Sequence, residues 1–284
     1  MPDPADLDLQ KEPQTPRQAP RRPPPIAPFV VAVLVVAAAA AAYFYLRPRP
    51  VVSPAPAGEV ATESDLPPLP PLGADVEPID LPPLDASDDL VRELVRGLSS
   101  HPRIAAWLTT DNLIRNFTVV VENIAAGRTP SGHLRVLKPE APFAVVDARG
   151  EEIVVDPRSY ERYNGIAAAA AAVDADGAAR LYTTLKPRIE EAWAELGGTG
   201  SFDRVLETAL VRLLETPAVA GEIALVPSGA VYNYSDPRIE RLTQAQKQLV
   251  RMGPQNVRTI QRKLRQIALA LGIPPERLAA RGPI

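Results

Sequence analysis

Basic and amide side chains near the end of the chain have the types and spacing that bind anions. From residue 236 onward, basic residues outnumber acidic ones ten to three, although the whole chain carries a formal net charge of −3. A helix expected at 254–271 places Arg258, Arg262 and Arg265 together, away from its apolar face. The amides at its start can also receive an anion. The candidate anion or partner surface consists of Lys247, Arg251, Gln255, Asn256, Arg258, Arg262 and Arg265.

A surface of this charge predicts a partner of negative charge. The candidates are an envelope protein, the phosphates of an anionic glycolipid, and the acidic segment of the chain itself. Nucleic acid is not expected as a partner, because aromatic residues are sparse and no nucleic-acid-binding motif occurs. The alternative is a helix face that contacts only solvent.

Three asparagines border the apolar stripe of a second expected helix, which Thr110 or Asp111 should cap and which ends before Gly127. Their spacing places them along one flank of this helix. Amides at such positions form hydrogen bonds between neighbouring helices, and a small polar groove is the alternative. The candidate structural amides are Asn112, Asn116 and Asn123.

The sequence contains no recognisable catalytic signature. It has no cysteine, which excludes thiol catalysis, zinc sites with Cys ligands and iron–sulfur ligation. His101 and His133 lie far apart, and no phosphate-binding loop or nucleophile elbow occurs. Glu190, Glu191 and Glu195 are expected on a solvated helix face, but a carboxylate pair depends on tertiary distance. We therefore expect no catalytic residue, no metal and no cofactor.

An apolar run at residues 26–46 predicts a transmembrane helix. It carries no charged residue, and its helical length of about 31 Å matches a hydrocarbon core of roughly 30 Å. Four Lys and Arg residues precede it and two follow it closely. This bias predicts that residues 1–25 stay in the cytoplasm and that the rest of the chain lies in the periplasm. The chain would then pass once through the lipid bilayer of the inner membrane. Residues 1–25 are expected to be disordered because of their composition. A cleaved signal peptide is the alternative.

Residues 47–86 predict a disordered linker. The segment is rich in proline, poor in large apolar residues and acidic, with seven acidic against two basic residues. Such a composition favours polyproline II and cannot bury a core. The functional interpretation is a spacer that holds a domain away from the membrane, and disorder without a selected length is the alternative.

Residues 87–272 predict a helical domain, and residues 273–284 a C-terminal tail. The fold class is mainly α with one or two small β-hairpins, because apolar residues recur at helical spacing and only short β-type runs interrupt them. The hairpins are expected within 143–155 and 223–234. They could pair into one sheet, since a lone hairpin would be marginally stable.

Five segments resemble a bacterial family called domain of unknown function 3014. They read LPPLDASDDLVRE, WLTTDNLIRNFTVVVENIA, DPRSYERYN, LYTTLKPRIEEAWAELG and LTQAQKQLVRMGPQNVRTIQRKLR. The resemblance covers residues 81–271. It implies a membrane-tethered envelope protein of Gram-negative bacteria with a similar N-terminal span, and it brings no activity, substrate or site residue.

The sequence therefore predicts a membrane-anchored protein of the cell envelope. Its expected role is that of a non-catalytic scaffold or partner-binding module in the periplasm. The alternative is an envelope hydrolase that acts on glycan or peptide by carboxylate acid–base chemistry. A cleft holding two carboxyl groups with perturbed pKa values would favour the enzyme. A flat exposed apolar or basic patch without a cleft would favour the binding module.

Overall fold

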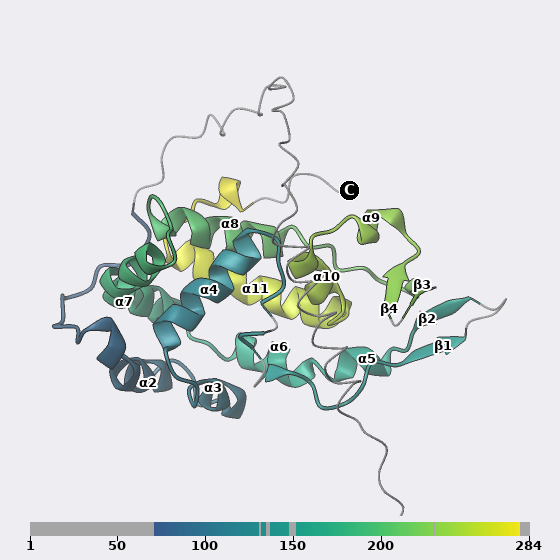
Figure 1. The fold of residues 1–284 in the computed structure, drawn as a ribbon, viewed down its shortest axis with the longest axis horizontal. Helices are drawn as coiled ribbons and strands as arrows, with labels where there is room; N and C mark the ends of the chain where they lie inside the picture. Colours follow the sequence, from purple (N-terminus) through teal and green to yellow (C-terminus); the bar gives the residue numbers. More distant parts are fainter. Residues whose placement is uncertain (1–70, 131, 135–136, 148–151, 230, 279–284) are drawn as a thin grey trace, which may run out of the picture. The chain divides into compact units, whose positions relative to one another are not determined.

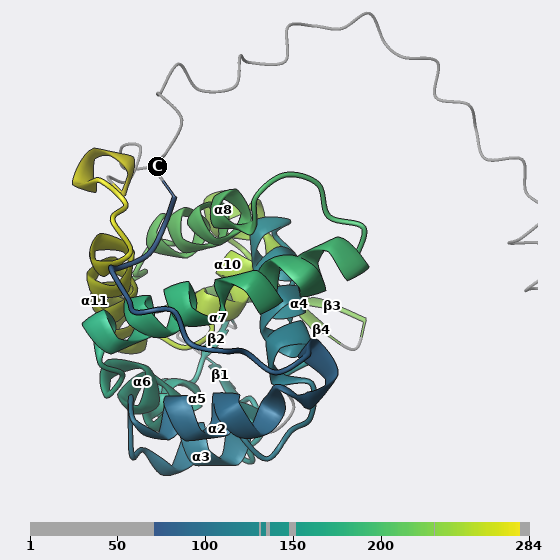
Figure 2. The same cartoon turned by 90° about the vertical axis from the view of Figure 1, so that its left-hand side faces the viewer.

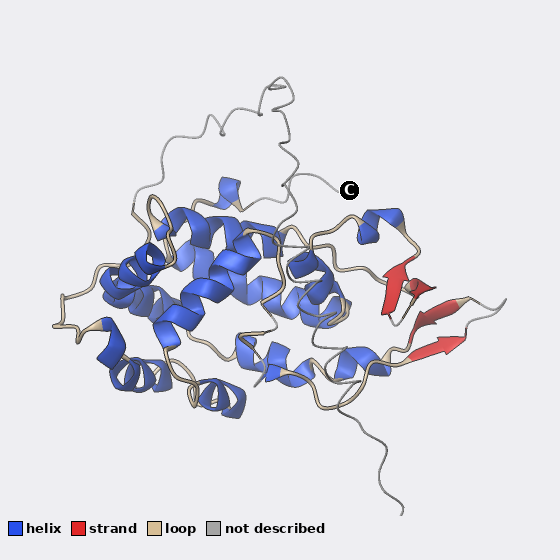
Figure 3. Cartoon of the chain, in the orientation of Figure 1, coloured by secondary structure: helices blue, strands red, loops and turns tan. Residues whose placement is uncertain are grey.

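A computed structural model describes residues 71–130, 132–134, 137–147, 152–229 and 231–278. Within these ranges the chain forms ten α-helices and one four-stranded antiparallel sheet, drawn in Figure 3. The predicted fold class, mainly α with small hairpins, is confirmed for this part of the chain. The arm and transmembrane helix predicted at 1–25 and 26–46 lie outside it, and none of the described helices has the length and apolarity that a membrane span requires.

Four amphipathic helices form the centre of the helical part (Figure 1). They are α4 (Leu113–Ala125), α7 (Ala175–Glu195), α8 (Phe202–Leu214) and α11 (Pro254–Ala270). Both α4 and α11 pack against α7 and α8. Their inward residues, such as Val121, Leu185, Phe202, Leu210 and Ala268, are buried in one apolar core. The core therefore lies where the apolar stripes of the four helices meet.

Shorter helices cover this centre. In Figure 2, α2 (Asp88–Arg96) and α3 (Pro102–Trp107) lie below α7, and α8 lies above α7. Helix α3 packs against α6 (Asn164–Ala171), which packs against α11. The remaining helices are α5 (Arg158–Glu161), α9 (Pro237–Glu240) and α10 (Gln244–Val250), and short 3₁₀ turns occupy Leu84–Ala86 and Pro275–Arg277.

The two predicted hairpins pair into one sheet of order β1-β2-β3-β4, which lies at the opposite end of the unit from α7 (Figure 1). The strands are β1 (Val145–Asp147), β2 (Ile153–Val155), β3 (Ala224–Ser228) and β4 (Val231–Tyr234). Ile153 pairs with Leu225 and Val154 with Ala224. A second apolar cluster, which includes Val155, Leu225 and Tyr234, packs the sheet against α9 and α10.

Helix α4 begins differently from the prediction. Neither Thr110 nor Asp111 caps it; Asn112 precedes it with a positive φ of 55°. The carboxylate of Asp88 from α2 accepts hydrogen bonds from the backbone N–H groups of Asn112 and Leu113, at 2.7 and 2.8 Å. A residue distant in sequence therefore satisfies the first donors of the helix, which local spacing could not indicate.

The last part of the predicted linker packs on the helical domain. Leu72 and Leu84 are buried, and the N–H of Leu72 donates to Asp203 at 3.1 Å. The N–H of Gly73 donates to the carbonyl of Leu271 at 3.0 Å, and a Cβ at Gly73 would collide with a side chain of α7. The contacts of the domain thus begin before the predicted boundary at residue 86. Buried leucines and hydrogen bonds to the domain together hold this segment, whose proline content indicated disorder.

The predicted C-terminal tail also contributes to the domain. Ile273 and Leu278 are buried in the main core. Between them, Arg277 donates to the carboxylate of Glu207 at 2.6 Å. The described part of the tail therefore closes one side of the core beside α8.

Candidate functional site

An apolar cavity of about 400 Å³ lies among helices α2, α3, α4, α7, α8 and α11. Its lining is made almost entirely of aliphatic and aromatic side chains, among them Trp107, Phe117 and Tyr182. Protein interiors normally contain few voids larger than a water molecule. The volume lies within the range of about 300–1,000 Å³ that is typical of small-molecule sites. The cavity is therefore the strongest candidate for a binding site in the described part of the chain.

The apolar stripes of the central helices produce this cavity. Leu113 and Val121 of α4 and Leu185 of α7 face it from positions that repeat at helical spacing. Small residues keep it open, since Ala178 of α7 and Ala209 of α8 also line it. Larger side chains at these two positions would occupy part of the volume.

One rim of the cavity is incompletely covered. Leu98, Ile104 and Trp107, from the α2–α3 side, line the cavity and are only half-buried. Val173 and Leu264 face the cavity from other elements and are half-buried as well. Helix α3 has no fully buried residue. A ligand would therefore enter most easily beside α3.

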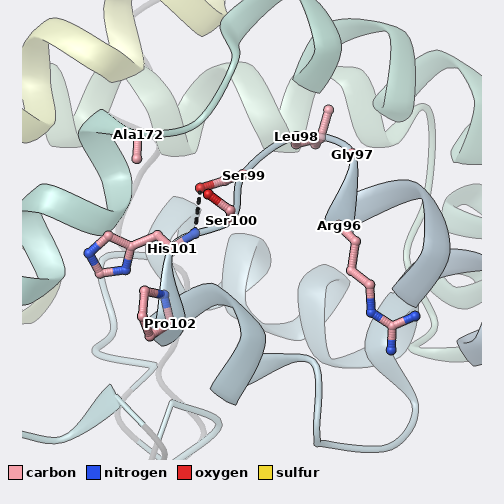
Figure 4. Close-up of a pocket in the computed structure, with 8 residues that line it drawn as sticks. All are labelled: Arg96, Gly97, Leu98, Ser99, Ser100, His101, Pro102 and Ala172. Carbon is pink, nitrogen blue, oxygen red and sulfur yellow. Dashed lines mark hydrogen bonds between the residues drawn. The ribbon is translucent and has the colours of Figure 1, made fainter.

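A second hollow, lined by both polar and apolar groups, adjoins this rim at the loop between α2 and α3 (Figure 4). It has a volume of about 650 Å³ and is open to solvent. Leu98 lines both the hollow and the cavity, and Ala172 of the hollow precedes Val173 of the cavity. The backbone N–H of Asp174 donates to the carbonyl of Leu98 at 3.2 Å. This bond holds the α6–α7 turn against the loop, so the hollow and the cavity are neighbours.

The ring of Tyr182 lines the cavity, and its hydroxyl forms a hydrogen bond with Asp203. The hydroxyl donates to Asp203 at 2.6 Å, and the same carboxylate accepts from Lys186 at 2.5 Å and from the N–H of Leu72. Burial and the hydrogen bond to Asp203 raise the pKa of Tyr182. The polar end of the tyrosine is thus satisfied, which leaves the cavity lining apolar.

The raised pKa of Tyr182 predicts a loss of stability at alkaline pH. The unfolded state releases its phenolic proton near the ordinary tyrosine pKa of about 10, whereas the folded state retains it. The contribution is therefore complete below about pH 10 and disappears as the pH rises through the folded-state pKa. Urea unfolding at several alkaline pH values should show a shallower decline for Tyr182→Phe than for the native protein. Equal slopes would contradict this assignment.

Three members of the predicted anion surface make contacts within the domain. Lys247 donates to the carboxylate of Glu240 at 2.7 Å and lowers its pKa. Arg251 donates to a neighbouring glutamine. Asn256 is buried, and its amide donates to the α5–α6 segment at 3.0 Å. These three side chains are engaged inside the protein rather than presented on one surface.

The other members of the predicted surface are exposed on α11. Arg258, Arg262 and Arg265 point away from the core, as their spacing predicts, and Gln255 is exposed near the start of the helix. Within the described ranges no ion pair or hydrogen bond involves the three arginine side chains. We call this set of three the arginine stripe, and it is the part of the predicted surface that an anion can reach.

The arginine stripe predicts a charge-dependent interaction. Replacing all three arginines by glutamine should make the protein elute from an anionic matrix at clearly lower salt, because the attraction depends on their clustering. The melting temperature should hardly change, since these side chains are exposed. A matched control replaces the scattered residues Arg128, Arg180 and Arg241. Elution of both variants at the same salt would reject the stripe as a binding surface.

The three candidate structural amides make local hydrogen bonds. Asn112 accepts from an arginine one turn later. Asn116 donates to the carbonyl of Asp111 at 2.7 Å, and Asn123 donates to a carbonyl one turn earlier at 2.8 Å. Local bonds thus replace the expected bonds between helices, because each amide reaches its own helix or its flanking turn first. Asp88, which sequence reasoning missed, makes the connection between α2 and α4.

Among the residues that the structure describes, no carboxylate lines the cavity. Glu190 accepts from the N–H of Phe202 at the start of α8, and Glu191 and Glu195 each pair with an arginine. His101 caps α3 through its side chain. In the ranges that the structure describes, no group of three potential metal ligands occurs. The described lining of the cavity therefore offers apolar contacts and no carboxylate pair.

Comparisons with known proteins give one match. No curated protein and no solved structure matches the chain. A family model described as protein of unknown function (DUF3014) matches residues 113–268, which is more than half of the chain and runs from the first residue of α4 almost to the end of α11. The match thus contains four of the helices that form the cavity, and the chain belongs to the DUF3014 family.

Proposed function

We propose that this protein is a membrane-anchored component of the cell envelope whose helical domain binds the apolar part of a lipid-like ligand. Its role would be that of a non-catalytic binding module, which holds or presents the ligand to a partner. The observation that carries the proposal is the apolar cavity of about 400 Å³ in the middle of the domain.

The energy of an empty cavity supports occupancy by a ligand. Empty apolar volume between helices is destabilising, because the side chains around it lose the contacts that close packing would provide. Water is a poor occupant, because the lining offers almost no hydrogen-bonding group. An apolar ligand gains about 0.8 kcal/mol for each methylene group that leaves water.

The predicted tether supports a lipid as the source of this ligand. A transmembrane helix at 26–46 and a proline-rich linker behind it would keep the domain close to a bilayer, which is a reservoir of acyl chains. Tethering raises the local concentration of the domain at the membrane without any added contact. The arginine stripe would add attraction to an anionic glycolipid or to an acidic envelope protein.

Photolabelling in intact cells tests the binding function. Cells that produce the full chain are given a photoactivatable fatty acid, irradiated and lysed, and labelled peptides of the purified protein are identified by mass spectrometry. We expect label in the peptides that contain Trp107, Phe117 or Tyr182, since these side chains line the cavity. Label confined to residues 26–46 would reject ligand binding by the domain while leaving the membrane anchor in place.

Fractionation and protease accessibility test the proposed location. The full chain should sediment with inner membranes, and protease added to spheroplasts should degrade the domain. Recovery of the protein in the soluble fraction would reject the anchor. Protection of the domain from the added protease would reject the periplasmic orientation.

A further inference from the structure

We infer that the ligand is a single-chain amphiphile whose acyl chain fills the apolar cavity while its anionic head lies in the hollow of Figure 4. The inference rests on the proposed function and names the ligand class. Its basis is that Leu98 belongs to both spaces. A molecule with an apolar and a polar end would satisfy both at once.

The volume of the cavity selects one chain rather than two. A methylene group is similar in size to a water molecule, whose share of liquid volume is about 30 Å³. The cavity of about 400 Å³ therefore accommodates about a dozen such groups. This is the size of one medium-length acyl chain, so a lipid with two long chains would leave most of its carbon outside.

Polar groups of the α2–α3 loop face the hollow. Figure 4 draws Ser99, Ser100 and His101 among the residues that line the hollow, together with Ala172 from the end of α6. Ser99 Oγ accepts from the N–H of His101 at 3.2 Å. The hydroxyl of Ser100 has no hydrogen-bond partner among the described residues, so it can donate to a ligand.

The cap of α3 orients the imidazole of His101. Its Nδ1 accepts from the backbone N–H of Arg103 at 3.2 Å. In the neutral ring the proton must then be on Nε2, which becomes a donor. Nε2 makes no hydrogen bond within the described ranges, so it is available to an oxygen atom of a head group.

Charge at the rim favours an anionic head. Arg96 lines the hollow, and Lys263 of α11 donates to the carbonyl of Val173 at 2.7 Å. The acid at the same rim, Asp174, already accepts from the N–H of Gly177 and pairs with a neighbouring arginine. Arg96 and Lys263 thus place positive charge at this rim. A carboxylate or a phosphate monoester would be attracted, and both are chemistries that occur on single-chain lipids.

The two tryptophans of the chain allow a direct test. Trp107 lines the cavity, whereas Trp193 does not and packs on Phe202. In a Trp193→Phe protein, a brominated acyl chain can quench the remaining tryptophan only at close range. Among the described residues the Nε1 of Trp193 has no hydrogen-bond partner, so replacing Trp193 by Phe removes no hydrogen bond that the structure shows. The full chain is placed in lipid nanodiscs and titrated with brominated laurate, brominated methyl laurate and a brominated lysophosphatidic acid.

Two substitutions remove the head-group contacts and keep the fold. Ser100→Ala deletes a free hydroxyl, and His101→Asn preserves a side chain that caps helices well. In the double variant, the Kd for the brominated acids should rise about tenfold or more, as expected for lost hydrogen bonds to a charged group. The Kd for the uncharged methyl ester should stay unchanged. The acid with the lower Kd identifies carboxylate or phosphate as the preferred head.

The outcomes separate this inference from the proposed function. If the ester and the acids quench Trp107 equally, and the double variant changes neither, the head-group site is rejected and acyl binding stands. If none of the brominated chains quenches Trp107, the cavity does not bind acyl chains and both proposals fail. An equal loss of binding for ester and acids in the double variant would also reject the head-group site, because it indicates a change in the cavity.

Discussion

Replacing Ala178 and Ala209 together by leucine should raise the free energy of unfolding of the ligand-free protein by about 1–3 kcal/mol. Both side chains line the cavity, and each substitution buries three additional carbons worth about 0.8 kcal/mol apiece, less the side-chain entropy that is lost. In a densely packed core the same substitutions would cost about 1–3 kcal/mol through overpacking. An increase in the free energy of unfolding would therefore show that the cavity is empty, and a decrease would show that it is already filled.

The same variant should lose its response to ligand. A ligand at 100 times its Kd stabilises the folded state by about 2.7 kcal/mol, so laurate should raise the melting temperature of the native protein by several degrees. In the filled variant this increase should disappear, together with photolabelling of the domain. Ala194→Leu, at an exposed position of the same helix α7, is the matched control and should respond to laurate like the native protein.

Two results would contradict the cavity as the site of the ligand. One is a lower melting temperature of the Ala178→Leu/Ala209→Leu protein in the absence of ligand, which would mean that the helices already pack closely there. The other is an unchanged response to laurate in a variant that is stabilised. In that case the space exists but the ligand binds elsewhere.

Local patterns in the sequence predict most of the elements of the fold. The apolar stripe of α4 and the capping box of Thr243 and Gln246 lie where the spacing places them. The pairing of two hairpins follows from the instability of either hairpin alone. These features depend on neighbouring residues or on one simple requirement, so one sequence is sufficient to predict them.

The features that the sequence does not predict depend on tertiary distance. The carboxylate of Asp88 caps α4 from another helix. Leu72 and Leu84 lie in a proline-rich segment, and only the shape of the domain surface allows them to be buried. The cavity is the clearest case, because an apolar helix face has the same pattern whether its partner lies in contact or several ångströms away. The small residues Ala178 and Ala209 line the cavity. Alanine is also common in ordinary helices, so these residues do not predict a cavity from the sequence.

The last part of the predicted linker is connected to the cavity through the carboxylate of Asp203. Asp203 accepts from Leu72 on one side and from Tyr182 on the other, and the ring of Tyr182 lines the cavity. The carbonyl of Leu271, whose side chain also lines the cavity, accepts from Gly73. The entry of the chain into the domain and the wall of the cavity are thus stabilised by the same group.

Asp203→Ala should therefore be among the most destabilising substitutions in the domain, with an expected cost of about 3–5 kcal/mol. Asp203 is 7% exposed, and its removal leaves Lys186 without its ion partner and the hydroxyl of Tyr182 without an acceptor. The N–H of Leu72 also loses its acceptor, which should free the segment before α2. Urea unfolding of the full chain measures the cost, and limited proteolysis within residues 71–86 measures the release.

Asp176 provides a control that distinguishes the hydrogen-bond network of Asp203 from the general effect of a negative charge at the start of a helix. Asp203 lies in the first turn of α8, and Asp176 lies in the first turn of α7 but is exposed. Interaction with the helix dipole alone is worth about 0.3–1 kcal/mol, so Asp176→Ala should cost no more than this and should leave residues 71–86 protected. Asp203→Asn keeps the shape and one acceptor oxygen, so its cost should lie between the two alanine variants. Equal costs for Asp203→Ala and Asp176→Ala would show that Asp203 acts only through the helix end, and the proposed connection between the segment and the cavity would then be wrong.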